Sequence, residues 1–219
     1  PDTDEGYPGN LDVKCSFRWT EDNELQVSYE AVTDRDTPVN ITGHGYFNLA
    51  GHESDTDAAK QILMINADHF TPTDENLIAA GEIRPVGNTA FDFREPKLIG
   101  RDIEADDVQL IYGGGYDHNW VLNKTEHGAF MLAARLFSPE SGISMEMYTD
   151  QPGLQFYAGN FLNGQRGKGG TCYGRRQGAA FEAQNFPNAV NTAHFPTPVL
   201  KAGEKYIHRT AYKFIDTKV

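Results

Sequence analysis

Cysteine is scarce in this chain of 219 residues, and long apolar runs and an excess of positive charge are absent. Its two cysteines, Cys15 and Cys172, are too few for the disulfide scaffold of a small secreted domain, and no zinc-site spacing occurs. No apolar run is long enough to span a membrane, and no signal-peptide pattern occurs. We expect no metal and a cytoplasmic location, while the periplasm and secretion stay open.

The net charge of −12 limits the classes of partner. Nucleic acids and anionic membranes both require a basic surface, so we expect neither as a partner. A neutral or cationic small molecule is compatible with this charge. The length suits one domain with a substantial core, and no internal repeat or linker divides it, so we treat residues 1–219 as one unit.

Helical periodicity is also scarce. The best short helical candidate is Lys97–Ile103, which follows Pro96 and is interrupted by Gly100. The 22 glycines, together with 13 Phe and 10 Tyr, favour strands and tight turns instead. The sequence therefore predicts an all-β protein with little helix.

Period-two alternation marks the predicted strands. Residues 13–19 and 25–31 alternate around the polar turn Glu21–Asn23, which is typical of an antiparallel hairpin. Met131–Phe137 and Ile143–Thr149 flank a five-residue turn and predict a second hairpin. A late strand is predicted at Tyr206–Phe214. Many short strands between turns favour a sandwich or barrel-like stack of sheets.

Three segments are polar in ways that strand packing does not require. His44 lies between two glycines and beside aromatic residues, residues 113–120 join three glycines to an Asp-His-Asn run, and Glu182 follows a small apolar stretch. Taken singly, each has a more ordinary interpretation: a core histidine, a glycine-rich turn and a solvated carboxylate. A desolvated carboxylate, in contrast, is a useful base near neutral pH.

Taken together, these segments resemble the aldose 1-epimerase (galactose mutarotase) family. Several blocks occur in the family's order, which makes the resemblance far more specific than any single motif. The blocks are Gly6-Tyr7-Pro8-Gly9-Asn10-Leu11, Thr37-Pro38-Val39-Asn40, His44-Gly45-Tyr46-Phe47-Asn48-Leu49-Ala50-Gly51, Phe91-Asp92-Phe93-Arg94, Gly115-Tyr116-Asp117-His118-Asn119, Pro152 to Phe161 and Phe181-Glu182-Ala183-Gln184-Asn185-Phe186-Pro187.

The resemblance implies a large antiparallel β-sandwich of the galactose mutarotase type that interconverts the α and β anomers of a free aldose, such as glucose or galactose, without a cofactor. Glu182 matches the family's general base and His44 its general acid. Asp117 and Gln155 match residues that hold sugar hydroxyls, and Tyr46 lies in the wall beside the acid. We expect the acid and the base to face one cleft, separated by about the width of a sugar ring.

The chemistry agrees with these roles. Opening a pyranose removes a proton from the C1 hydroxyl and delivers one to the ring oxygen. A Glu with a reference pKa of about 4.3 is readily ionised, and a His with one of about 6.5 can carry the acidic proton. Neither a metal nor a nucleophile is needed.

Two departures from the family pattern lead to further expectations. The family usually has Asn-His-Ser where this chain has Gly43-His44-Gly45, which leaves the acid less firmly oriented. The family's amino-terminal part, with its Arg and a second active-site His, has no counterpart here, so the fold is expected to be incomplete at that end. We expect that segment, or a companion chain, to cover an edge or apolar surface around Val13–Trp19.

Two other functions remain open at this point. A catalytically impaired carbohydrate-binding module of the same fold is one, although binding alone would not need both an acid and a base. A hexose-6-phosphate 1-epimerase relative is the other, since Lys168, Arg175 and Arg176 form a basic cluster suited to a phosphate.

Overall fold

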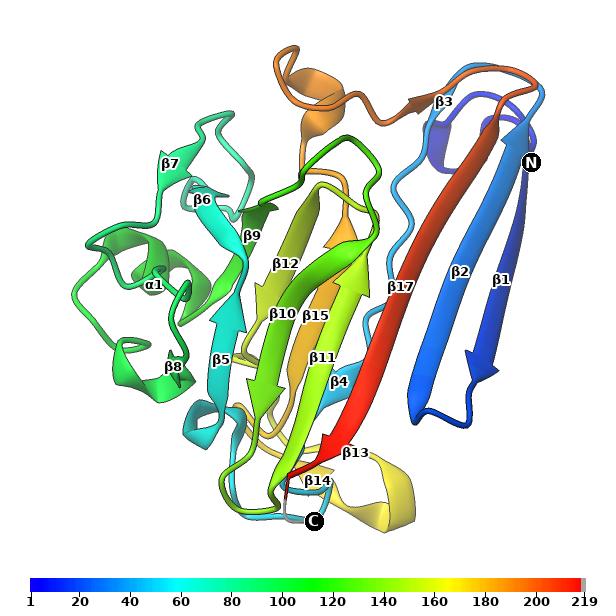
Figure 1. The fold of residues 1–219 in the computed structure, drawn as a ribbon. Coiled ribbons are helices and arrows are strands. Elements are labelled where there is room, and N and C mark those ends of the chain that lie inside the picture. The colour runs from blue at the N-terminus through cyan, green and yellow to red at the C-terminus, as the bar shows by residue number, and fades with distance from the viewer. Residues whose placement is uncertain (218–219) are drawn as a thin grey trace.

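Two antiparallel sheets account for most of the strands in the computed structural model, which describes residues 1–217 (Figure 1). The larger sheet has seven strands, in the order β1 (Leu11–Trp19), β2 (Glu24–Thr33), β17 (Lys205–Asp216), β11 (Ile143–Thr149), β10 (Met131–Phe137), β5 (Ile62–Ile65) and β8 (Lys97–Leu98). The other has six, in the order β4 (Tyr46–Phe47), β15 (Ala179–Gln184), β12 (Gly153–Tyr157), β9 (Asp117–Leu122), β6 (Ala67–Thr71) and β7 (Arg84–Pro85). The predicted all-β sandwich is confirmed.

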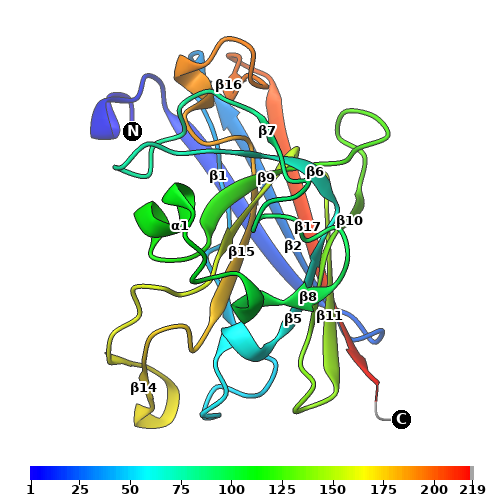
Figure 2. The same cartoon turned by 90° about the vertical axis from the view of Figure 1, so that its left-hand side faces the viewer.

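Shorter elements join the sheets. Two small pairs consist of β13 (Gln165–Arg166) with β14 (Cys172–Tyr173), and β16 (Val199–Leu200) with β3 (Thr37–Pro38). Single 3-10 turns lie at Asp4–Gly6, Ala58–Lys60, Ile99–Arg101, Lys168–Gly170 and Ala189–Asn191. The α-helix is α1 (Val108–Gly113), which Figure 2 shows on the same side of the molecule as β8. Among the described helices, none has the length and apolarity that a membrane crossing requires.

Both hairpins predicted from alternation are present. Strand β1 pairs with β2 along its whole length, and β10 pairs with β11 around the turn at residues 138–142. The late strand is β17, which fills the place between β2 and β11. These strands were predictable because local alternation alone marks each of them.

The helical candidate at Lys97–Ile103 is wrong. Its first two residues form β8, which pairs with β5, and a 3-10 turn follows at Ile99–Arg101. A Cβ at Gly100 would lie 2.9 Å from the carbonyl oxygen of Ala59, so the glycine permits a close backbone approach. Helix α1 was not predicted. It begins at Asp107, whose side chain accepts a hydrogen bond from the Gln109 amide, and it ends at Gly114 with φ of 62°.

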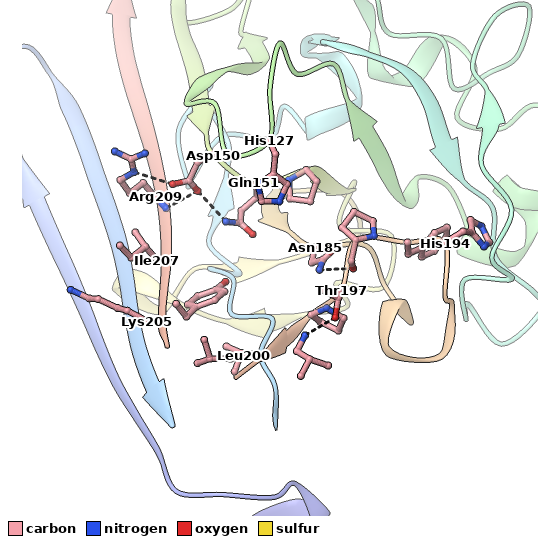
Figure 3. A pocket seen from close by; sticks show the side chains of 18 residues that line it. His127, Asp150, Gln151, Asn185, His194, Thr197, Leu200, Lys205, Ile207 and Arg209 are labelled. Carbon is pink, nitrogen blue, oxygen red and sulfur yellow. Dashed lines mark hydrogen bonds and ion pairs between the residues drawn. The ribbon is translucent and has the colours of Figure 1, made fainter. Parts of the chain in front are cut away.

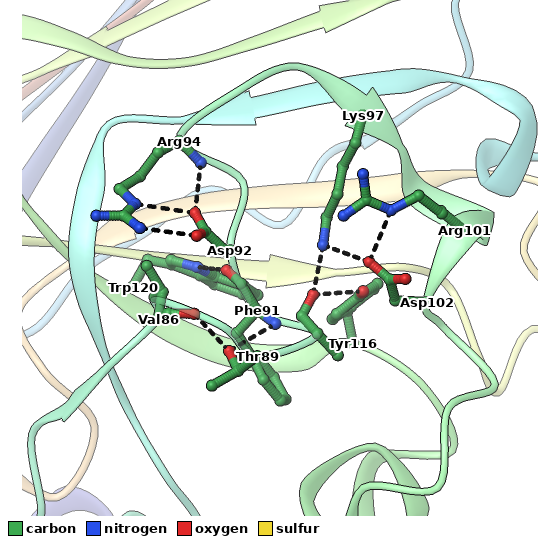
Figure 4. A network of polar contacts seen from close by, with 11 residues as sticks. Val86, Thr89, Phe91, Asp92, Arg94, Lys97, Arg101, Asp102, Tyr116 and Trp120 are labelled. Carbon is green, nitrogen blue, oxygen red and sulfur yellow. Dashed lines mark hydrogen bonds and ion pairs between the residues drawn. The ribbon is translucent and has the colours of Figure 1, made fainter.

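The core lies between the two sheets and is rich in aromatic residues. On β9, His118 and Trp120 face inward, where the indole donates a hydrogen bond to the Phe91 carbonyl. Burial lowers the pKa of His118 to about 3, which makes it a neutral core histidine at physiological pH. Figure 4 shows a second hydrogen bond to the loop that contains Phe91, in which the Tyr116 hydroxyl donates to the Ala90 carbonyl. The inward side chains therefore fix β9 from the core side.

A buried cation completes this network. The ammonium of Lys97 donates to the Ala90 carbonyl at 2.6 Å and to Asp102 at 2.7 Å, and it lies 4.2 Å from the centre of the Phe93 ring (Figure 4). Its partners compensate for the cost of burying the charge. The network ties the loop at residues 89–94 to the strand that begins just after Tyr116.

Strand β1 is an edge strand with an uncovered apolar face. Val13, Phe17 and Trp19 point to the same side as the buried residues of β2 opposite them, yet Phe17 is 69% exposed and Trp19 59%. Figure 1 shows β1 and β2 at one side of the molecule, beyond β17. The inner face of the seven-stranded sheet therefore extends past the sheet that covers it.

Candidate active site

Two rows of side chains cross the six-stranded sheet on the face opposite the core. In the first row, Thr71, Asn119, Gln155 and Glu182 are direct cross-strand partners on β6, β9, β12 and β15. Side chains of cross-strand partners lie on the same face of a sheet. The register therefore brings two predicted site residues, Gln155 and Glu182, side by side.

The second row runs beside the first. Asp117, Tyr157, Ala180 and Tyr46 are cross-strand partners on β9, β12, β15 and β4. Each residue of the second row is two positions from a first-row residue on the strands that both rows share, so both rows occupy one face. Four of the five predicted site residues thus lie on this face because of sheet register. The amide nitrogen of Gln155 donates to an Asp117 carboxylate oxygen at 2.8 Å, which links the rows.

His44 reaches this face from the segment before β4. Its Nε2 lies 3.5 Å from Oε1 of Glu182. The ring centroids of His44 and Tyr46 are 5.0 Å apart, and those of His44 and Tyr157 are 6.2 Å apart. The imidazole is half exposed, whereas the Glu182 carboxylate is largely buried. The predicted acid and base are therefore neighbours.

The expected separation of a sugar ring between His44 and Glu182 is not observed. The two groups are within ion-pair distance. The flanking Gly43 and Gly45 give the imidazole no side-chain support, and the nearby carboxylate attracts the ring. A sugar ring bound between them requires His44 to move away.

Three contacts anchor the segment that leads to His44. The Val39 amide donates to Pro198, and the side chain of Asn40 binds both backbone groups of Asn185, at 2.9 and 3.1 Å. A ring nitrogen of His208 lies 2.8 Å from the Ile41 carbonyl. Asn185 lies three residues after Glu182. Asn40 therefore connects the segment that leads to His44 with the end of the strand that carries Glu182.

Burial dominates the electrostatics of the two carboxylates. Desolvation raises the pKa of Glu182, the nearby His44 opposes this shift, and the Asp117 charge adds to it. Desolvation also raises the pKa of Asp117, against the hydrogen bond from Gln155 and the attraction of His44. A carboxylate whose pKa is raised in this way is a stronger base than a solvated one.

Two amide oxygens in the first row have no protein partner. Oδ1 of Asn119 and Oε1 of Gln155 are buried and accept no hydrogen bond from any described residue. Buried acceptors without a donor are uncommon and costly, and they are frequent at binding sites. This face thus holds an imidazole, two desolvated carboxylates and buried amide groups.

Three residues at or beside this face were not predicted from the sequence. Tyr157 occurs in a block that was recognised but was given no role, although its ring packs on both His44 and Tyr46. Asn40 was likewise only part of a block, and His208 fell within a predicted strand and was given no role. Strand alternation in Gln155–Tyr157 was a usable indication for Tyr157. The contacts of Asn40 and His208 are long-range and leave no local pattern.

Two of the three residues of the basic cluster proposed for a phosphate, Arg175 and Arg176, are engaged by groups of the protein itself. Arg176 is buried and donates to Glu104 at 2.6 Å, and both Arg175 and Arg176 donate to the Gly114 carbonyl. The two guanidinium groups therefore bind the protein's own backbone instead of a phosphate. The structure gives no support to the hexose-6-phosphate alternative.

One cavity has His44 in its lining, and a second does not. One of about 300 Å³ lies between the His44 segment and the inner face of β1 and β2, and its lining includes Phe17 and Tyr29. A cavity of about 1030 Å³ lies farther away, beside β17, and contains none of the five predicted site residues (Figure 3). In it, the Asp150 carboxylate is already bound by Arg209 and Gln151. The predicted acid and base meet at the sheet face and not in this larger cavity.

No group of three His, Cys, Asp or Glu within residues 1–217 is arranged to hold a metal ion. The model of the family described as aldose 1-epimerase matches residues 1–213, nearly the whole chain. The chain belongs to the aldose 1-epimerase family. The resemblance drawn from its sequence blocks is confirmed.

Curated relatives agree with this assignment. The chain is 45% identical to galactose mutarotase of Sus scrofa and 44% identical to that of Homo sapiens, each over 98% of its length. It is 40% identical to aldose 1-epimerase of Escherichia coli over the same share. The chain spans about 60% of the length of these relatives.

Solved structures of aldose 1-epimerase type have the same fold. An aldose epimerase homologue from C. elegans superposes with a TM-score of 0.86 at 30% identity, and covers 99% of this chain and 64% of its own. Galactose 1-epimerase from Lactobacillus acidophilus superposes with a TM-score of 0.84 at 33% identity, over 99% of this chain and 60% of its own. The sandwich is therefore the family's fold.

Proposed function

We propose that this chain carries the acid and base of an aldose 1-epimerase and interconverts the α and β anomers of a free aldohexose such as galactose or glucose. One observation carries the proposal: a desolvated Glu182 lies 3.5 Å from the imidazole of His44, on the face that also holds Asp117 and Gln155. The names of the relatives support the same reaction.

The reaction follows from the chemistry of these groups. Glu182 removes the proton from the C1 hydroxyl while protonated His44 donates a proton to the ring oxygen, and the C1–ring oxygen bond breaks to give the open-chain aldehyde. Rotation about C1–C2 presents the other face of the carbonyl. The C5 hydroxyl then attacks this face, its proton returns to His44, and Glu182 gives its proton back to the new C1 hydroxyl.

Substrate binding is assigned to the polar residues of the two rows. Asp117 and Gln155, which are hydrogen-bonded to each other, hold the sugar hydroxyls. The faces of Tyr46 and Tyr157 pack against the C–H surface of the ring. Entry of the sugar displaces His44 from Glu182, and Gly43 and Gly45 make that movement inexpensive.

Polarimetry on freshly dissolved α-D-galactose or α-D-glucose tests the proposal. The chain should accelerate the change in optical rotation, and Glu182→Gln should abolish the acceleration. A chain that binds galactose but does not change the rate would instead be a sugar-binding module. No acceleration and no binding would reject both roles for this chain alone.

We propose further that a preceding segment or a companion chain packs on the exposed face of β1. Three observations support this: the unpaired edge of β1, the exposure of Phe17 and Trp19, and the greater length of the relatives. The chain alone is then expected to bind aldoses weakly and to interconvert them slowly. Adding the preceding segment should restore both properties, and full activity of the 219 residues alone would contradict this.

We also propose a cytoplasmic location. Cys15 and Cys172 are both free and exposed, which suits a reducing compartment. Quantification of free thiols in protein purified without reductant tests this: both should react with a thiol reagent at once.

A further inference from the structure

We propose that Asn160 is a positioning residue for sugar binding, and that it acts by fixing the backbone from which Asp117 projects. This inference rests on the proposed function, because it assigns Asn160 to the site that binds the aldose. Asn160 lies beyond the end of β12, is 5% exposed and was not among the predicted site residues.

The side chain of Asn160 forms hydrogen bonds with the turn that precedes β9. Its Nδ2 donates to the Gly113 carbonyl at 3.0 Å and to the Tyr116 carbonyl at 2.9 Å. The Tyr116 carbonyl also accepts a hydrogen bond from the Ala158 amide. Asp117 is the next residue after Tyr116. One amide group thus binds both ends of the turn that leads directly into Asp117.

The turn is shaped to admit this side chain. Gly115 has φ of 134°, a region that residues with a Cβ rarely adopt. A Cβ at this position would also collide with Oδ1 of Asn160. The close approach and the backbone conformation therefore both require glycine here, and the asparagine fills the space that the glycine leaves.

A buried arginine holds the other side of the amide. Nε of Arg176 donates to Oδ1 of Asn160 at 3.3 Å, and Nη2 donates to the Gly114 carbonyl at 3.1 Å. Its third nitrogen, Nη1, binds Glu104 at 2.6 Å. Asn160 and Arg176 together bind three of the four carbonyls between Gly113 and Tyr116. The amide orientation is fixed because its oxygen faces a donor and its nitrogen faces two acceptors.

The same segment also holds a wall of the site. The amide of Phe161, the next residue, donates to the Tyr157 hydroxyl at 2.8 Å. Tyr157 and Asp117 are cross-strand partners in the second row. The segment at Asn160 and Phe161 therefore supports Asp117 through the preceding turn and Tyr157 through its hydroxyl group.

The carboxylate of Asp117 has only one protein hydrogen-bond donor among the described residues, the amide of Gln155. Its place above the sheet therefore depends on its own backbone, which is held by the preceding turn on one side and by the pairing of β9 with β12 on the other. A loosened turn would change where the carboxylate meets a sugar hydroxyl. It would leave Glu182, on β15, and His44, in the segment before β4, in position.

The experiment compares Asn160→Asp with Asn66→Asp in the 219-residue chain. Asp is isosteric with Asn but cannot donate to a carbonyl. Asn66 is a matched control because its amide also donates to a carbonyl, that of Leu132, near the opposite end of β9. We expect Asn160→Asp to raise the KM for galactose, and its Kd measured by NMR titration, about tenfold, with kcat changed by less than about threefold. Asn66→Asp should change neither constant.

A double-mutant cycle separates positioning from general destabilisation. If Asn160 acts through Asp117, then Asn160→Asp should have less than about a twofold effect on Kd in the Asp117→Asn background. An unchanged Kd for the single variant, or an equal loss in both backgrounds, overturns the proposal. If Asn160→Asp does not fold, Arg176→Lys replaces it, and an unchanged Kd overturns the proposal in the same way.

Measuring Kd also distinguishes a failure of the positioning role from a failure of the proposed reaction. A wild-type chain that binds galactose without interconverting its anomers contradicts the proposed reaction, and the cycle on Kd still tests Asn160. A chain that interconverts anomers normally with Asn160→Asp contradicts only the positioning role.

Discussion

His44 Nε2 lies 3.5 Å from Glu182 Oε1, although the two residues come from segments far apart in the sequence. Strand β15 supplies the carboxylate, and the segment before β4 supplies the imidazole. The short pairing of β4 with β15 at Tyr46 and Ala180 brings them together. His44 and Glu182 are close enough for one small substrate to contact both, provided that the imidazole can move.

Replacing Glu182 by Gln should reduce kcat by about 10²- to 10⁴-fold, the usual contribution of a positioned general base. The amide has nearly the same shape but cannot take a proton from the C1 hydroxyl. Polarimetry gives the rate, and circular dichroism checks that the fold is retained. A variant with more than about a tenth of the wild-type kcat would contradict the role of Glu182 as the base.

The same substitution should raise stability at neutral pH. Burial raises the folded-state pKa of Glu182 above its unfolded value, so the folded state prefers the protonated carboxyl. The group therefore costs no stability below its unfolded pKa and costs stability as the pH rises through the folded pKa. Gln is neutral throughout. Thermal melts should show Glu182→Gln above wild type at pH 7 and level with it below about pH 4, near the reference pKa of Glu.

An equal difference in melting temperature at both pH values would show that the desolvated charge is not its cause. Glu146→Gln is a suitable control. The hydrogen bond from Tyr148, and then that from Arg135, hold the pKa of Glu146 below its ordinary value. Its replacement should lower stability at pH 7 rather than raise it.

Asn40→Asp should lower kcat more than it raises KM. The side chain of Asn40 both donates to and accepts from the backbone of Asn185, three residues beyond Glu182. The aspartate still accepts a hydrogen bond but no longer donates one. The segment that leads to His44 is then held less firmly to the end of the strand that carries Glu182. Loss of one such hydrogen bond costs about 1 kcal/mol, or roughly fivefold in rate if it is felt only in the transition state. Steady-state polarimetry separates kcat from KM, and an effect confined to KM would contradict this.

Local pattern predicted much of the fold and little of the site's geometry. Strands such as β1, β2 and β11 alternate with period two, and each was found from its own residues. Helix α1 has only six residues, too few to show a helical period, and its best indication was the cap at Asp107. The segment at Lys97–Ile103 was misread because the pairing of β8 with β5 outweighs its local preference.

The site residues were found through resemblance to a family, and their arrangement came only from the structure. The row from Thr71 to Glu182 depends on the register of four strands from distant parts of the chain. Register is set by long-range packing and leaves no mark in any single segment. The closeness of His44 to Glu182 likewise depends on a segment of non-strand backbone between Asn40 and Tyr46.

The apolar face of β1 should promote self-association of the 219-residue chain. Val13 is 50% exposed and Phe17 69%, and both belong to β1, an edge strand of the seven-stranded sheet. Exposed apolar edges attract further strands. Val13→Thr combined with Phe17→Thr should lower the association seen by light scattering at high protein concentration. The control Ile111→Thr, at a 63% exposed position on α1, should not, because Ile111 lies on no sheet edge.

The stability of the same variants tests what covers β1. In the chain alone, Phe17→Thr should change the free energy of unfolding by no more than about 0.5 kcal/mol, as expected at an exposed site. If a preceding segment or companion chain packs on β1, Phe17 becomes buried, and its loss should then cost about 1.5–3 kcal/mol. Denaturant unfolding of Phe17→Thr, with and without that segment, measures both values. Equal costs in the two cases would mean that the segment packs elsewhere and that the face of β1 stays open.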